Sequence, residues 1–199
     1  MIRNVVVSLF RDLTTKTDNM QPQGFSYEHL PLELTQYPQF VLWRRVWLPD
    51  KNKFTKLPIN GVLNKVSIRE ETNYLTFNAA LKAFSTLQAL GQDDVGVGFI
   101  FTKNDPFVFV DLDNVVGAGQ WTSSAMAHLY NQCGSWAEYS QSGNGIHIIG
   151  KSSTALTHID NDAGLEVYSG GRFVALTGWH IPESGQNVRD LSTILPPRS

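Results

Sequence analysis

An apolar run that ends in two acidic residues constrains the fold of this chain more than any other feature. Residues 107–110 (FVFV) are followed by Asp111 and, two positions on, by Asp113. Such a run predicts a β-strand, whose alternate side chains share a face, so the two carboxylates would point the same way. Burying them unpaired is costly, and like charges at that separation repel. We expect the pair to share a proton, to border solvent or to hold a divalent cation, and oxygen ligands favour Mg²⁺ or Mn²⁺ over zinc.

The same Asp-x-Asp pattern also has a purely structural interpretation. Aspartate side chains accept hydrogen bonds from nearby backbone amides, so the pair is also typical of a turn or a helix cap at a strand end. The pattern alone leaves both interpretations open, and the segments that follow it are needed to choose between them.

Two strand-like segments follow at residues 135–140 and 145–151. Their link, residues 141–144 (QSGN), predicts a hairpin turn, because Gly and Asn readily adopt the positive φ angles that such a turn needs. His147 would then project from the face opposite to that of its isoleucine neighbours.

A second hairpin is predicted from residues 165–168 and 172–176, with residues 169–171 (SGG) as its turn. In its first strand Leu165 and Val167 form an apolar face, which leaves Glu166 and Tyr168 on the other face.

Polar residues thus interrupt otherwise buried patterns in several strands, and local rules tend to be broken at functional sites. A lone His is more often held by a backbone carbonyl, and a lone Glu by an arginine such as Arg172. Four polar groups in consecutive strands of one sheet favour a shared site instead, formed by Asp111, Asp113, His147 and Glu166.

The ordered set of segments resembles the primase-polymerases of the archaeo-eukaryotic primase superfamily, in particular the N-terminal catalytic domains of phage and plasmid replication proteins. The resemblance covers Phe40 to Gly178. Its segments are 40–45 (FVLWRR), 54–60 (FTKLPIN), 76–84 (TFNAALKAF), 96–101 (GVGFIF), 108–114 (VFVDLDN), 140–150 (SQSGNGIHIIG) and 165–178 (LEVYSGGRFVALTG). Many relatives carry Asp in the last segment where this chain has Glu166, which we interpret as a conservative ligand change.

The resemblance implies an α+β fold with an archaeo-eukaryotic primase-like core. In it an N-terminal α/β subdomain faces, across a cleft, a subdomain with an antiparallel sheet like that of an RNA-recognition motif. It also implies an activity: a DNA polymerase or primase, that is, a template-directed nucleotidyltransferase that extends a primer on DNA. The expected partners are a DNA template-primer, nucleoside triphosphates and a helical or helicase region further along the same polypeptide.

The resemblance also assigns roles to residues. Asp111, Asp113 and Glu166 would hold two Mg²⁺ or Mn²⁺ ions, which in such sites lie roughly 3.5–4 Å apart. His147 and Ser142 would contact the incoming triphosphate.

Three further nucleotide contacts are expected. Gly143 and Gly145 would let the backbone approach the phosphates, and the amides of that turn could act as an anion nest. Arg172 would be an additional phosphate ligand, with a salt bridge to Glu166 as the alternative.

Basic and aromatic residues are interleaved between positions 43 and 56, where a single acidic residue, Asp50, occurs. Cations contact phosphates and aromatic rings stack on unpaired bases, so this segment is a candidate nucleic-acid or nucleotide surface. The alternative is a hairpin with a solvated basic edge. The candidate nucleic-acid-binding residues are Arg44, Arg45, Lys53 and Lys56, interleaved with Trp43, Trp47 and Phe54.

Composition limits the other possibilities. The 199 residues carry a formal net charge of −2, which argues mildly against a general nucleic-acid-coating protein. No apolar stretch is long enough to span a membrane, so we expect no membrane partner and a cytoplasmic protein of a bacterial or archaeal host cell. Cys133 is the only cysteine, which excludes an intrachain disulfide and a cysteine-based zinc site.

Periodicity predicts the remaining elements. Strands are expected at 39–48, 53–59, 95–101 and 107–112, and helices at 76–90 and 122–133, each ended by a glycine. We expect an N-terminal extension at 1–24, a catalytic domain of two subdomains at 25–190, and a linker or tail at 191–199.

Other functions remain open from the sequence. A metal-dependent nuclease would use the same carboxylates, and a catalytically inactive DNA- or nucleotide-binding module of a replication protein would retain the fold without a working site. A plain structural protein would have no reason to place acids at these strand ends.

Overall fold

The computed structural model describes residues 24–195, and the predicted N-terminal extension therefore lies almost wholly outside the described residues. The helices are α1 (Leu32–Thr35), α2 (Phe77–Ala89) and α3 (Ser124–Cys133), with 3₁₀ turns at Tyr27–His29, Pro49–Lys51 and Glu71–Asn73. The strands are β1 (Phe40–Leu48), β2 (Lys53–Ile59), β3 (Val95–Phe101), β4 (Phe107–Leu112), β5 (Val116–Gly117), β6 (Gln120–Trp121), β7 (Ala137–Tyr139), β8 (Ile146–Lys151), β9 (Thr157–Asp160), β10 (Leu165–Tyr168) and β11 (Arg172–Ala175).

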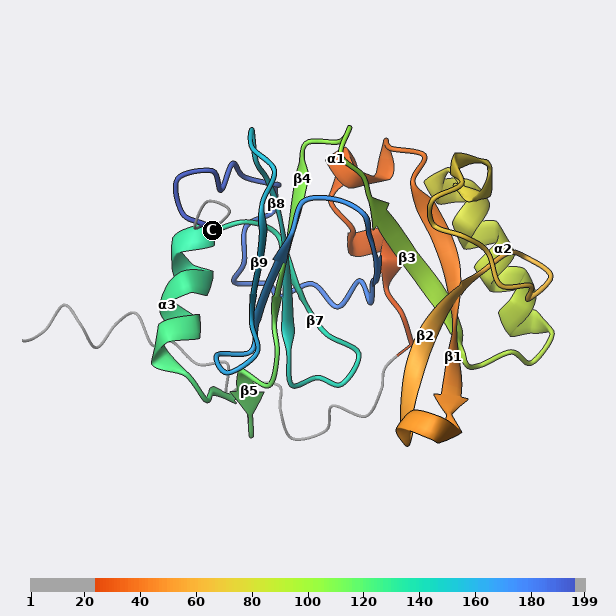
Figure 1. Cartoon of the computed structure of the whole chain (residues 1–199), viewed down its shortest axis with the longest axis horizontal. Coiled ribbons are helices and arrows are strands. Elements are labelled where there is room, and N and C mark those ends of the chain that lie inside the picture. The colour runs from red at the N-terminus through yellow and green to blue at the C-terminus, as the bar shows by residue number, and fades with distance from the viewer. Residues whose placement is uncertain (1–23, 196–199) are drawn as a thin grey trace, which may run out of the picture.

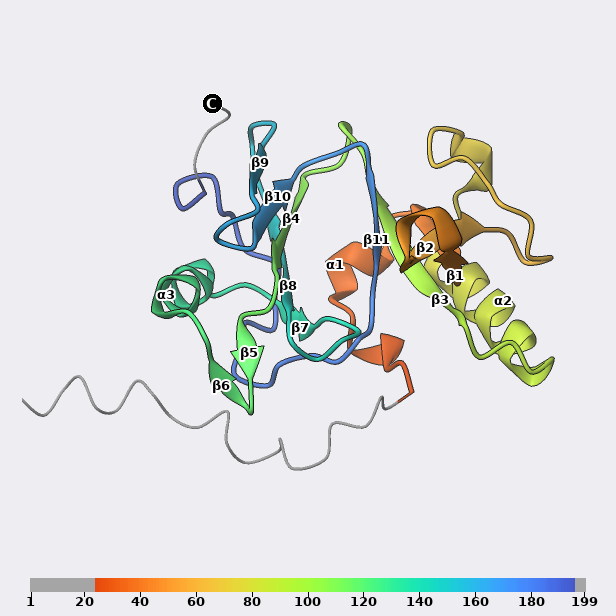
Figure 2. The ribbon, with the colours of Figure 1, turned by 60° about the horizontal axis from the view of Figure 1, so that its bottom comes forward.

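Two antiparallel sheets form the body of this mixed α+β fold. One has four strands in the order β11-β3-β1-β2, the other has five in the order β7-β8-β4-β10-β9, and β5 and β6 form a short ribbon. Figures 1 and 2 show α2 beside the four-stranded sheet and α3 beside the five-stranded sheet, at opposite ends of the molecule. Within residues 24–195, no helix combines the length and apolarity needed to cross a membrane.

Local signals explain the two long helices. The Thr76 side chain accepts a hydrogen bond from the Ala79 backbone N–H at 3.3 Å, which caps the start of α2. Ser123 caps α3 in the same way, and Gly134 ends it in the left-handed conformation with φ of 50°. Both predicted helices are confirmed, with boundaries shifted by one or two residues.

The five-stranded sheet is packed on both faces. Val108, Val110 and Leu112 belong to one buried cluster, together with Met126 of α3. The alternate residues on the opposite face, among them Phe109, belong to a second cluster that includes aromatic residues of β3. The alternation expected for residues 107–112 is therefore confirmed, and the polar site residues lie on the second of these faces.

The second predicted hairpin is wrong. Strand β10 pairs with β4 and β9, whereas β11 pairs with β3 of the other sheet, so residues 169–171 cross between the sheets. A Cβ added to Gly170 would lie 3.0 Å from the carbonyl carbon of Thr102, which shows that this crossing packs against the β3–β4 connection. A Gly-rich turn suits such a crossing as well as a hairpin, because both need positive φ, and Gly171 has φ of 67°.

Strand β10 instead pairs with the strand that precedes it in the sequence, β9, which was not predicted. Its residues (THID) are mostly polar and only partly buried, so they lack the apolar pattern that predicts a strand. The folded part also continues beyond the predicted start of the tail, because Leu191 and Leu195 are buried in the core. Residues 196–199 lie outside the described residues.

Candidate active site

A row of four polar side chains crosses the five-stranded sheet. Glu138 of β7 pairs with His147 of β8, His147 pairs with Asp111 of β4, and Asp111 pairs with Glu166 of β10. Residues directly opposite one another in a sheet share a face, so these four side chains lie side by side. We call them the polar row. The expectation that Asp111, His147 and Glu166 lie in neighbouring strands of one sheet is confirmed.

The first pair in the polar row, Glu138 and His147, is buried. His147 Nδ1 lies 2.9 Å from Glu138 Oε1, and Glu138 has no exposed surface. The Glu138 carboxylate also accepts hydrogen bonds from the backbone N–H groups of Thr177, at 3.1 Å, and Gly178, at 2.7 Å. Both oxygens of this carboxylate accept from backbone N–H groups, so we assign the proton of the shared hydrogen bond to His147 Nδ1, which leaves Nε2 directed toward Asp111.

The electrostatics of His147 follow from its two acidic neighbours. Burial lowers its pKa, but the hydrogen bond and charge of Glu138, together with the charge of Asp111, raise it more. The pKa of His147 is therefore above its ordinary value, and the distance from Nε2 to Asp111 Oδ1 is 3.9 Å.

Asp111 occupies the centre of the polar row. Burial raises its pKa to about 6, the charge of His147 opposes this, and the charges of Asp113 and Glu166 add to it. Its Oδ1 atom is buried and accepts no hydrogen bond from any residue between 24 and 195. A buried carboxylate oxygen without a donor is costly unless something else occupies its lone pairs.

The Glu166 carboxylate is bound by a residue of its own strand, Tyr168. The Tyr168 hydroxyl donates a hydrogen bond to Glu166 Oε2, and the Arg172 guanidinium lies 4.5 Å from the centre of the Tyr168 ring. Burial, the hydrogen bond and the charge of Glu166 raise the pKa of Tyr168 to about 12. In the part of the chain that the structure describes, Arg172 and Glu166 form no ion pair, and Arg172 lies over the Tyr168 ring instead.

Asp113 lies outside the row. It follows the last residue of β4, is exposed, and donates its backbone N–H to the Gly164 carbonyl at 2.8 Å. Among residues 24–195, no three His, Cys, Asp or Glu side chains are already gathered as a metal-binding group. Asp113 influences Asp111 by charge, but it would have to turn inward to share a ligand with it.

The predicted phosphate-binding turn is already well bonded within itself. Gly143 N–H donates to the Ser140 carbonyl at 2.9 Å, and Gly145 N–H donates to Ser140 Oγ at 3.1 Å. Asn144 N–H donates to Ser142 Oγ at 3.3 Å. The three amides that an anion nest would use therefore have partners inside the turn, while the exposed Ser142 residue borders solvent.

The structure divides the four candidate nucleic-acid-binding residues between two faces. Arg45 and Lys56 are directly paired, so they share a face. Arg44 and Lys53 alternate with them and lie on the opposite face, where Arg44 forms an ion pair with Asp94 at 2.7 Å.

Lys56, on β2 of the other sheet, lies within range of the charges of the polar row. Burial above all lowers its pKa, while the negative charges of Asp111 and Glu138 act in the opposite direction. The motif that contains Lys56, residues 54–60, gave no indication of this proximity.

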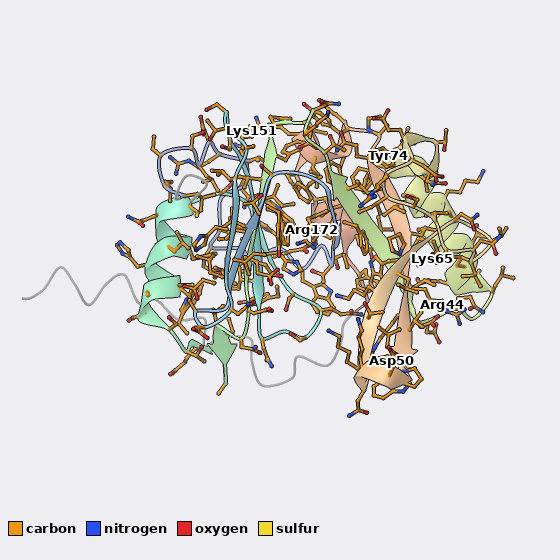
Figure 3. All side chains as sticks on the ribbon, in the orientation of Figure 1. Arg44, Asp50, Lys65, Tyr74, Lys151 and Arg172 are labelled. Carbon is orange, nitrogen blue, oxygen red and sulfur yellow. The ribbon has the colours of Figure 1, made fainter. Side chains whose placement is uncertain are left out.

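Arg172, which lies over the Tyr168 ring near the polar row, also lines a groove. Figure 3 shows Arg172 between the two sheets. The volume of the groove is ≈ 640 Å³. Basic side chains are frequent along it, and its lining residues are Pro58, Lys65, Val66, Ser67, Ile68, Arg69, Gly171, Arg172 and Phe173. Lys65 and Arg69 could not be predicted from the sequence, because they lie in an irregular segment whose place in the fold depends on distant strands.

Comparison with known proteins agrees with the motifs. No family model matches the chain. The chain is similar to a DNA primase-polymerase of Nitratiruptor phage NrS-1, with 34% identity over 151 residues. The matched region is 73% of this chain and 20% of the relative, so the chain spans about a fifth of that protein's length.

Proposed function

Because this chain is a relative of the phage primase-polymerases, we propose that it is the catalytic core of a template-directed nucleotidyltransferase that extends a primer on DNA. One observation carries the proposal: Asp111 is a buried carboxylate with an unpartnered oxygen, and its neighbours in the sheet are a second carboxylate, Glu166, and a histidine, His147. Groups whose pKa is perturbed by burial and by like charges are typical of catalytic sites.

The buried, unpartnered Oδ1 atom of Asp111 and the carboxylates near it suit a divalent metal site, which Asp113 would join by turning inward. Asp111, Asp113 and Glu166 would hold two Mg²⁺ or Mn²⁺ ions, since carboxylate oxygens are the ligands these ions prefer. The charges of Asp113 and Glu166 both raise the pKa of Asp111, so cations here would relieve repulsion among the three carboxylates. When bound, such ions supply activation of the primer 3′-hydroxyl and charge neutralisation at the departing pyrophosphate.

The chain's own side chains would bind and orient the nucleotide. His147 directs Nε2 toward Asp111 and, in the protonated form that its acidic neighbours favour, would donate from this atom to the triphosphate, with Ser142 as a further contact. Arg172 lies at the boundary between the row and the basic groove, where it would contact a phosphate. Lys56, opposite the row, would contact the nucleotide or the template.

Primer extension on a DNA template tests this function. Deoxynucleotides and ribonucleotides are supplied separately, with Mg²⁺ and with Mn²⁺. We expect template-dependent extension by the wild type and none by Asp111→Asn or Asp113→Asn, because each change removes a charge that holds metal and keeps nearly the same volume.

Two controls define the outcome. Leu90→Ala changes an exposed residue at the end of α2 and should extend like the wild type. Labelled DNA incubated with metal but without nucleotides should remain intact. Degradation that depends on Asp111 would support a nuclease instead, and neither extension nor degradation would support an inactive binding module.

A further inference from the structure

The β1–β2 hairpin carries a stripe of alternating aromatic and cationic side chains along one face. Residues that pair directly, and residues two apart along a strand, share a face of a sheet. Three such cross-strand pairs follow one another from the hairpin tip inward, and we call them the aromatic stripe: Trp47 with Phe54, Arg45 with Lys56, and Trp43 with Pro58.

Contacts within the stripe order its rings. The Trp47 and Phe54 ring centroids are 4.9 Å apart, in an edge arrangement with an interplanar angle of 63°. The Arg45 guanidinium lies 4.0 Å from the centre of the Phe54 ring, and the Lys56 ammonium lies 5.4 Å from that of Trp43. Arg45 therefore lies over the ring of Phe54, and this contact holds that outer ring in a preferred orientation, while Lys56 lies over the buried ring of Trp43.

The outer end of the stripe is exposed. Trp47 is 44% and Phe54 is 53% exposed, although both are large apolar side chains. They lie near the hairpin tip, which Asp50 marks in Figure 3, and β2 is the edge strand of its sheet. Two adjacent exposed rings beside cationic side chains are typical of an interaction surface.

The inner part of the stripe, at Lys56, lies within range of the charges of the polar row. The charges of Asp111, Asp113 and Glu138 all act on Lys56. Phe54 lies on β2 two residues from Lys56 toward the hairpin tip, which is roughly 6.8 Å along the strand. This is about two base-stacking steps of roughly 3.4 Å. A strand that leaves the polar row toward the hairpin tip would therefore reach the exposed rings within a few nucleotides.

We propose that Trp47 and Phe54 form a stacking platform for unpaired bases of the single-stranded DNA template, with Arg45 and Lys56 on its phosphates. The choice of a template strand as the occupant rests on the proposed function. The chemistry of recognition is independent of it, because aromatic faces stack on unpaired bases of any sequence and cations neutralise the backbone. Paired bases hide their faces within a duplex, so the platform distinguishes single strands from duplex.

Binding without catalysis tests the platform. Fluorescence anisotropy gives the Kd of a labelled single-stranded oligonucleotide and of a blunt duplex of equal length, in EDTA and without nucleotides. Trp47→Ala and Phe54→Ala should each raise the Kd for the single strand about five- to 150-fold, which is the stacking energy of roughly 1–3 kcal/mol per base converted at about 1.4 kcal/mol per tenfold. The Kd for the duplex should change less than about twofold.

Three variants serve as controls. Val62→Ala and Leu90→Ala remove exposed apolar side chains elsewhere, 72% and 70% exposed, and should leave both Kd values unchanged. Trp47→Phe keeps an aromatic face and should retain most of the affinity for the single strand.

Several results would overturn the platform. Unchanged single-strand affinity in Trp47→Ala and Phe54→Ala would do so, and a lower melting temperature in the same variants would then assign the rings to hairpin stability. Equal losses for single strand and duplex would point to general electrostatics. A wild-type dimer in sedimentation that Trp47→Ala converts to monomer would identify a contact between copies of this chain.

Primer extension separates this inference from the proposed function. If the wild type binds single strands through the platform but never extends a primer, the platform stands and the polymerase proposal fails. If the wild type extends primers and Trp47→Ala binds and extends equally well, the polymerase proposal stands and the platform fails.

Discussion

His147 and Glu138 form a buried pair in which Nδ1 lies 2.9 Å from Oε1, and the same carboxylate accepts backbone hydrogen bonds from Thr177 and Gly178. Residues 177 and 178 follow β11, so the hydrogen bonds to Glu138 hold the segment after β11 beside the polar row. It does not reach Asp111 itself, and we regard it as a positioning residue for His147.

Glu138→Gln should lower the free energy of unfolding. An amide keeps one acceptor oxygen, but its NH₂ group would then face backbone N–H donors that need an acceptor. Leaving buried polar groups unsatisfied costs about 1–3 kcal/mol. Urea denaturation measures this, with the exposed Glu28→Gln as the matched control, expected within about 0.5 kcal/mol of the wild type.

The spectroscopic signature of His147 distinguishes positioning from mere stability. The wild type should show the His147 Nδ1 proton in ¹⁵N-correlated NMR spectra, whereas Glu138→Gln should alter the tautomer equilibrium while other core signals remain. An unchanged His147 signal in a folded Glu138→Gln variant would contradict the positioning role.

Asp111 should make stability fall with rising pH when metal is absent. Its pKa of about 6 in the folded protein lies above the ordinary value of 3.8, so folding favours the protonated form. The stability that this group contributes is fully present below about pH 4 and is lost as pH rises through about 6. In EDTA, Asp111→Asn should therefore gain stability over the wild type across this window, on the order of 2–3 kcal/mol at neutral pH.

Metal should reverse that difference. An ion that binds only the folded protein stabilises it by mass action, so Mg²⁺ or Mn²⁺ should raise the melting temperature of the wild type and have little effect on Asp111→Asn. The control is Asp162→Asn, an exposed change that should respond like the wild type. Equal metal responses of wild type and Asp111→Asn would contradict the metal assignment without reference to activity.

His147→Ala should separate nucleotide binding from DNA binding. If Nε2 contacts the triphosphate, the variant should bind nucleotide more weakly and incorporate it more slowly, with little change in affinity for primer-template alone. Calorimetry with each ligand measures both affinities. His128→Ala, exposed on α3, is the matched control. Equal loss of both affinities together with a lower melting temperature would favour a structural role for His147.

Gly178→Ala should destabilise the protein more than Gly171→Ala. The two glycines have similar positive φ angles, 70° and 67°, so the backbone strain of an added Cβ is about the same. At position 178 this Cβ would also lie 2.2 Å from the Ser26 carbonyl oxygen, while at 171 it meets nothing within 4 Å. We expect an additional loss of about 1–3 kcal/mol at 178, measured by urea denaturation. Equal losses would show that strain alone governs both positions.

The sequence by itself determined the elements that depend on neighbouring residues. Alternation along residues 107–112 and helical spacing along α2 are local patterns, and each predicted its element because burial acts on one face of a strand or helix. The same alternation placed Glu166 and His147 on polar faces, so three members of the polar row could be named before their contacts were known.

Only the tertiary structure decided which strands meet. The crossing from β10 to β11 resembles a hairpin turn locally, because its Gly-rich residues are compatible with both conformations. That β11 pairs with β3 and not with β10 therefore depended on the packing of the whole chain. Glu138 and Lys56 belong to the site for the same reason. Nothing beside either residue in the sequence indicates its partner, because the proximity of Lys56 to Asp111 and of Glu138 to Gly178 arises when segments 40 or more residues apart pack together.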